Sequence, residues 1–200
     1  VKGGRAAGVA LENGDELQAK IVMSAADPKR SFLHFVESRY FPDEFVEQIR
    51  NFRVRGSSGK VNIALSALPE FTCLPGESPL HKGAISISPS IDYIERAYDE
   101  AKYGQFSKNP YIDMIIPSMI DRDMAPPGHH VMSCFVQYAP YDIEGGWDDA
   151  KREAFGETVI STIERYAPNI RRIIVGKQVI TPKDIERIAG ITGGNIFPGR

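Results

Sequence analysis

The chain has 200 residues, of which 42% are hydrophobic and 25% are charged, a composition typical of a globular domain with an apolar core. Its net charge of −2 offers no general electrostatic attraction for nucleic acid or for an anionic membrane surface. Apolar runs extend over only a few residues, so the sequence predicts no transmembrane segment.

The first elements in chain order form a hairpin, a strand and a helix. Asn13-Gly14 lies between strand-like runs at 8–11 and 16–19, and this dipeptide is typical of a tight β-hairpin because both residues tolerate positive φ. The apolar run at 21–23 predicts a strand buried on both faces. Asp27-Pro28 then provides an N-cap acceptor and a first helical residue, so this stretch is predicted to be an α/β unit.

The pattern changes in the middle of the chain. A helix is predicted at 43–52, and the Arg-Gly-Ser-Ser-Gly stretch at 55–59 is interpreted as a flexible turn and a domain crossing. Beyond it, Val61, Ile63 and Leu65 alternate with smaller or polar residues. This alternation indicates a strand with one wet or ligand-facing side.

Strands and helices then follow one another without strict alternation. Further strands are predicted at 83–88, 111–116, 131–138 and 171–180, and further helices at 88–104, 147–167 and 181–190. This mixture predicts an α+β fold class, with a mostly antiparallel sheet and packed helices.

Histidine and cysteine provide few candidates for chemistry, and no catalytic residue is identified. His129 and His130 would point to opposite faces of a strand, so the pair does not readily chelate one metal ion and no metal site is predicted. A weaker alternative is a metal-dependent hydrolase that uses His129 with an acid from 121–123. Cys73 and Cys134 are isolated thiols, which favours a reducing, cytoplasmic type of compartment and leaves the organelle open.

Four aromatic residues have two interpretations. Tyr111, Phe135, Tyr138 and Tyr141 either line an apolar tunnel or pack in a core, and the core is the more common environment for any one of them.

Four blocks of the sequence carry a resemblance to a known family. They are the block GRAAGVALENGDELQAKIVMSAADPKRSFLHFV and the segments KVNIALSALPEF, PSMIDRDMAPPGHHVMSCFVQYAPY and ITGGNIFPG. Together they resemble the phytoene desaturase-related flavin amine oxidoreductases, which include carotenoid desaturases and isomerases and retinol saturases. The sequence starts without Met and ends just after the last block, which suggests an internal piece of such an enzyme.

The resemblance implies a split architecture. Residues 1–55 would be a partial FAD-binding, Rossmann-like domain with linking helices, 56–190 a substrate-binding domain, and 191–200 the start of a return segment. Small residues after a strand let a cofactor approach the backbone. By this resemblance Ser24, Ala25, Ala26 and Asp27, together with Gly193 and Gly194, are the candidate cofactor-binding residues.

Two functions are therefore predicted. The first is the substrate-binding portion of an FAD-dependent oxidoreductase with desaturase-, isomerase- or saturase-like chemistry on a hydrophobic small molecule. No GxGxxG fingerprint occurs in the chain, so by itself it is expected to be inactive and to retain no FAD. The alternative is a non-catalytic module that binds an apolar ligand or a protein. The electron acceptor, the substrate and the oligomeric state stay open.

Overall fold

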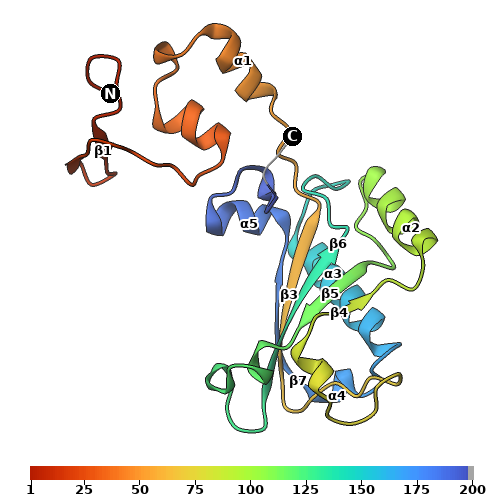
Figure 1. The fold of residues 1–200 in the computed structure, drawn as a ribbon. Helices are drawn as coiled ribbons and strands as arrows, with labels where there is room; N and C mark the ends of the chain where they lie inside the picture. The colour runs from red at the N-terminus through yellow and green to blue at the C-terminus, as the bar shows by residue number, and fades with distance from the viewer. Residues whose placement is uncertain (198–200) are drawn as a thin grey trace. The chain divides into compact units, whose positions relative to one another are not determined.

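The computed structural model describes residues 1–197, so the part of the predicted return segment at 198–200 lies outside the described residues. These residues divide into two compact units, 1–54 and 55–197 (Figure 1). Over the described residues, no helix is both long enough and apolar enough to cross a membrane.

The first unit contains the predicted hairpin and the predicted helix at 43–52. Strands β1 (Gly8–Ala10) and β2 (Glu16–Gln18) pair in antiparallel fashion, and Gly14 in their turn has a φ of 90°. A π-helical segment (Arg30–Phe35) and a 3-10 turn (Ser38–Tyr40) lead into α1 (Asp43–Asn51). Phe32 and Phe45 pack edge to face with their ring centres 5.2 Å apart, and this contact ties the segment to α1.

The prediction of a strand at 21–23 was wrong. These residues have no regular structure, and Ile21 and Met23 are 78% and 91% exposed. An extended segment becomes a strand only when neighbouring strands pair with its backbone. Within 1–54 the only sheet is the β1–β2 hairpin, so the apolar run has no sheet to join.

The second unit is built on a five-stranded sheet with the order β4-β5-β6-β3-β7, in which every neighbouring pair is antiparallel. The predicted combination of helices with a mostly antiparallel sheet is thereby confirmed. The strands are β3 (Ser58–Leu65), β4 (Ile85–Ile87), β5 (Tyr111–Ile115), β6 (His130–Gln137) and β7 (Ile174–Ile180).

Four helices accompany this sheet among the described residues. They are α2 (Ile91–Lys102), α3 (Asp149–Glu164), α4 (Ile170–Ile173) and α5 (Pro182–Ala189), with 3-10 turns at Pro79–Lys82, Pro117–Met119, Arg122–Met124 and Thr192–Gly194. Of these helices, α2, α3 and α5 lie where the sequence predicts helices. The side chain of Asp148 accepts from the Lys151 amide at 2.7 Å and caps α3. Ser90 caps α2 in the same way.

Two local predictions needed correction. Ser58 and Gly59 are not a flexible turn, because they are the buried first residues of β3. A Cβ on Gly59 would lie 2.6 Å from Cε1 of Phe155, so glycine here allows close packing of the strand on α3. The segment 171–173 is not extended, because it belongs to the short helix α4.

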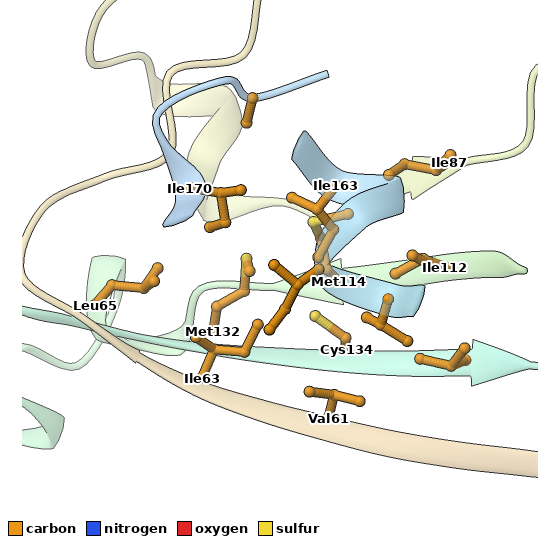
Figure 2. Packing of buried hydrophobic residues seen from close by; sticks show 14 of the residues in the cluster. Val61, Ile63, Leu65, Ile87, Ile112, Met114, Met132, Cys134, Ile163 and Ile170 are labelled. Carbon is orange, nitrogen blue, oxygen red and sulfur yellow. The ribbon is translucent and has the colours of Figure 1, made fainter. Parts of the chain in front are cut away.

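One face of the sheet forms the core of the second unit. Side chains from β3, β5 and β6 point toward those of α3 and α4, as Figure 2 shows for Val61, Ile63, Ile112, Met132 and Ile163. Cys134 belongs to this core and is fully buried, and its burial raises the pKa of the thiol to about 12. This cysteine therefore serves packing rather than redox chemistry, whereas Cys73 is exposed.

Candidate functional site

The face of the sheet opposite the core is the main candidate for a binding surface. Along β3, Val61, Ile63 and Leu65 are buried while the residues between them are exposed or half-buried, and β5 and β6 show the same alternation. We call this surface the open sheet face. It comprises Lys60, Asn62, Ala64, Tyr111, Asp113, Ile115, Val131, Ser133, Phe135 and Gln178.

Three polar side chains of the open sheet face, those of Asn62, Asp113 and Gln178, form hydrogen bonds within the sheet. The Asn62 amide donates to Oε1 of Gln178 at 3.0 Å, and the Ser86 hydroxyl donates to Oδ1 of Asp113 at 2.7 Å. Lys60 differs, because among the described residues no hydrogen bond or ion pair involves its ammonium group. The ammonium group of an exposed lysine is ordinarily hydrated. Lys60 is therefore a candidate binding residue for a ligand that covers this face and displaces that water.

An aromatic contact connects the open sheet face to the loop after α5. Phe135 in β6 and Phe197 pack edge to face with their ring centres 6.1 Å apart. Phe197 is 57% exposed, so the loop adds an apolar side chain to this surface.

The four aromatic residues considered for a tunnel do not gather around one space. Phe135 and Tyr111 lie on the open sheet face. Tyr138 packs against Tyr98 of α2, with ring centres 5.4 Å apart, and burial raises its pKa. The fourth, Tyr141, contacts α5 through Glu186.

The predicted cofactor residues Gly193 and Gly194 form a buried turn. The Gly193 amide donates to Oε1 of Glu186 at 2.7 Å, and the Gly194 amide donates to the Ile191 carbonyl at 2.9 Å. Gly194 has a φ of 60°, and a Cβ there would lie 2.0 Å from the Pro182 carbonyl oxygen. Close packing therefore requires the glycine, and both amides are already used inside the protein.

Tyr141 and Glu186 hold this turn in place. The Tyr141 hydroxyl donates to Oε2 of Glu186, whose other oxygen accepts from Gly193. The hydrogen bond to Glu186 is the main reason that the pKa of Tyr141 is raised. Lys183 lies over the Tyr141 ring, with Nζ 3.3 Å from its centre.

The other predicted cofactor residues belong to the first unit, whereas the glycine turn belongs to the second. The Ala26 amide donates to the Ser24 hydroxyl at 3.3 Å, which itself lies 2.7 Å from the Ser31 hydroxyl. The Arg30 amide donates to Oδ1 of Asp27 at 3.0 Å, so Asp27 caps the helical turn as its sequence position predicts.

These residues fit the edge of a cofactor site rather than a complete one. Ser24 and Ala25 are exposed and small, so a ligand can approach the backbone closely before a helical turn. The described residues of the first unit contain no parallel sheet and no glycine-rich strand-to-helix turn that would hold a pyrophosphate. The remainder of a dinucleotide site would have to come from other segments.

The histidine pair and the acidic loop lie around a surface pocket of about 890 Å³. Nδ1 of His130 is 3.2 Å from the Ser118 hydroxyl, and desolvation lowers the pKa of this histidine. The side chain of Asp121 caps the 3-10 turn at Arg122–Met124 by accepting from the Asp123 amide. Within 1–197, no group of three or more His, Cys, Asp or Glu side chains is arranged to hold a metal ion, so the structure adds no support for the hydrolase alternative.

Sequence reasoning missed Lys60 and Gln178 as residues of the open sheet face. The alternation at 61–65 already indicated a wet side for Asn62, and extending it back by one residue places Lys60 on that side. Gln178 had no such signal, because its position depends on how β7 pairs with β3.

Comparisons with known proteins relate almost the whole chain to an oxidoreductase domain-containing protein and to an isomerase. No protein-family model matches it. It is 37% identical over 204 residues to the rat pyridine nucleotide-disulfide oxidoreductase domain-containing protein 2, covering 98% of this chain and 35% of that protein. It is 26% identical over 202 residues to the carrot chloroplastic prolycopene isomerase, covering 99% of this chain and 30% of that protein.

A solved structure shows a more distant likeness. The crystal structure of an oxidoreductase from Methanosarcina mazei matches with a TM-score of 0.49 and 17% identity, covering 90% of this chain and 35% of that one. The chain thus spans about a third of the length of the curated relatives it matches.

Proposed function

Because the chain is related over almost its whole length to the phytoene desaturase-related oxidoreductases, as its sequence predicts, we propose that it supplies the substrate-binding portion of an FAD-dependent oxidoreductase. The substrate is a hydrophobic small molecule, and the reaction is a desaturation, an isomerisation or a saturation. Residues 56–190 bind the substrate, and 1–55 with 191–200 adjoin the cofactor.

The observation that carries this proposal is the one-sided sheet. Its buried face packs on α3 and α4, whereas the open sheet face presents apolar side chains, among them Phe135, Val131 and Ile115, beside polar ones. Antiparallel sheets often have one solvated face, but such a face ordinarily carries mainly polar side chains. A mixed apolar and polar surface suits a ligand with a long apolar body.

In this proposal the cofactor would be held mainly by segments outside the chain, with the Ser24–Asp27 stretch at its edge. FAD, when bound, supplies the group that accepts or donates hydride. The residues of this chain bind and orient the substrate and exclude water from it. The Glu186–Gly193 hydrogen bond fixes the loop whose Phe197 lies against Phe135.

The alternative is a module that binds an apolar ligand or a protein without catalysis. One observation favours it: the ionisable groups on the open sheet face are few. They are Lys60 and Asp113, together with the phenol of Tyr111, and Asp113 already accepts from Ser86. Such a face offers binding groups but no evident acid–base pair.

The visible absorbance spectrum of the purified longer protein separates the two functions. A flavin spectrum that bleaches when a hydrophobic donor is added without oxygen supports the oxidoreductase. A folded, colourless protein that cannot be reconstituted with FAD contradicts it and favours the binding module.

A further inference from the structure

The open sheet face carries a cation at a position that a covering ligand would have to accommodate. Strand register places Lys60 directly between Phe135 of β6 and Ile180 of β7. Among residues 1–197 its ammonium group has no hydrogen-bonding or ionic partner. It therefore lies as a single cation between two apolar side chains, on the strand next to the edge strand β7.

The other lysine close to this part of the sheet is already paired. Lys177 in β7 stands opposite Ile63, on the core side, and forms an ion pair with Glu153 of α3. The two lysines therefore have different roles. Lys177 joins β7 to α3, whereas Lys60 faces the side of the sheet on which the ligand is proposed to bind.

The single acid on the same face does not neutralise Lys60. Asp113 lies in the same row of the sheet, two strands away, with Phe135 between them. Its carboxylate accepts from the Ser86 hydroxyl at 2.7 Å, at the β4 side of the sheet. Charge is thus separated across the face, with the positive end near β7 and the negative end near β4.

A pure hydrocarbon is a poor match for this surface. Covering the Lys60 ammonium with an apolar chain removes its water without providing an acceptor, and such desolvation is unfavourable. A ligand that brings a carboxylate replaces that water with a charge-assisted hydrogen bond. The remaining length of such a ligand can lie over Phe135 and Ile115, which follow on β6 and β5.

We propose that the open sheet face binds a long apolar molecule that ends in a carboxylate, with Lys60 as the residue that contacts the carboxylate. This inference rests on the proposed function, because it names the substrate class of the same surface. Lys60 is here a specificity-determining residue that selects an acid over an uncharged compound with the same apolar body.

The test compares two probes on the purified longer protein, after incubation with FAD and with its flavin content recorded from the visible spectrum. Oleate and methyl oleate have the same apolar chain and differ in the charged end, so the ratio of their dissociation constants isolates the carboxylate contact. The wild-type protein is expected to prefer oleate by about tenfold or more, as for a hydrogen bond between charged groups. Lys60→Met should abolish the preference, and Lys60→Arg should keep most of it.

Lys108→Met is the matched control. Lys108 is exposed and lies in the loop between α2 and β5, so removing its charge changes the net charge equally without touching the open sheet face. The ratio of the dissociation constants for oleate and methyl oleate should be the same in Lys108→Met as in the wild type. If Lys60→Met does not fold, as judged by its melting temperature, Lys60→Gln replaces it.

Two results overturn the inference. One is an equal affinity of the wild type for the acid and the ester. The other is a preference for oleate that survives in Lys60→Met; if the flavin spectrum of that variant also changes, the ammonium group serves the flavin instead. Failure of the proposed function is recognised separately, by a protein that binds oleate selectively but holds no FAD.

Discussion

The backbone amide of Gly56 donates a hydrogen bond of 2.9 Å to the carbonyl oxygen of Gly193. This bond joins the segment that leads into β3 to the turn that follows α5, although the two lie far apart in the sequence. The Tyr141 amide also donates to the Gly56 carbonyl at 2.9 Å, so Gly56 is fixed on both sides. The start and the end of the second unit therefore form one assembled region rather than two independent loops.

Gly194→Ala is expected to destabilise this region. The residue has a φ of 60°, and the new Cβ would lie 2.0 Å from the Pro182 carbonyl oxygen, so the turn must move. We expect a loss of roughly 1–3 kcal/mol in the free energy of unfolding, measured from the urea midpoint. Gly176→Ala is the control, because no atom lies within 4 Å of its Cβ position. Equal midpoints for the two variants would contradict this account of the turn.

Asp184 makes stability depend on pH in the acid range. Burial alone would raise its pKa, but hydrogen bonds from Thr181, Arg187 and Arg152 outweigh burial and hold the pKa below its usual value. A lowered pKa stabilises the folded state above the unfolded pKa of about 3.9, and this contribution disappears as the pH falls through the folded pKa.

The variant Asp184→Asn tests this dependence. It should be less stable than the wild type by about 1–3 kcal/mol near pH 7, since it loses a buried charge-assisted network. The difference should stay constant down to about pH 5 and shrink below about pH 4. Urea denaturation at several pH values measures it, and a difference that grows on acidification would exclude the mechanism.

The two cysteines should differ in reactivity. Burial raises the pKa of Cys134 to about 12, so at pH 8 it is almost entirely a buried thiol, whereas Cys73 is exposed. Iodoacetamide is expected to modify Cys73 in the native protein and both cysteines after denaturation. Peptide mass mapping reports the two sites separately. Rapid native modification of Cys134 would mean that the core opens easily.

Gly59 and Phe155 should be energetically coupled. A Cβ on Gly59 would lie 2.6 Å from the Phe155 ring, so Gly59→Ala should cost about 1–3 kcal/mol through overpacking. Phe155→Leu removes that ring and should recover part of the loss in the double variant. A double-mutant cycle on the unfolding free energies measures the coupling, and strict additivity would refute the proposed clash.

Phe135→Ala should act on binding differently from the lysine variants. Phe135 contacts the apolar body of the proposed ligand, so truncation should weaken oleate and methyl oleate by similar factors, of about tenfold. The ratio of the two dissociation constants should then stay at its wild-type value. Titration of both probes measures this, and selective loss of oleate binding would assign Phe135 to the charged end instead.

Elements with a strong local signal were predicted correctly, among them the strands β4, β5 and β6, whereas the strand predicted at 21–23 was not found. The helix predicted at 147–167 appears as α3 (Asp149–Glu164), because its capping acids and its apolar spacing are local. Thr181 and Gly190 likewise bound α5 on both sides. The run at 21–23 also has a strand-like composition, but a strand requires pairing partners, which local sequence does not reveal.

The candidate site was likewise predicted only as far as local sequence patterns allowed. The one-sided alternation of β3 was visible in the sequence, and it indicated a wet or ligand-facing side. The row that puts Lys60 between Phe135 and Ile180 depends on the strand order, which brings together segments far apart in the chain. The neighbours of Lys60 could therefore not be predicted, because they depend on the register of the strands and not on the residue types along the chain.

The strand order also has a consequence for how the protein folds. Among the described residues, strand β3 pairs with β6 and β7, both of which follow much later in the chain. During synthesis, the apolar strip of Val61, Ile63 and Leu65 stays uncovered until α3 and α4, which pack against it, have been made. Such long-range pairing slows folding and leaves apolar surface exposed in the nascent chain. We therefore expect a chaperone that binds apolar segments to act on the nascent chain before α3 is made.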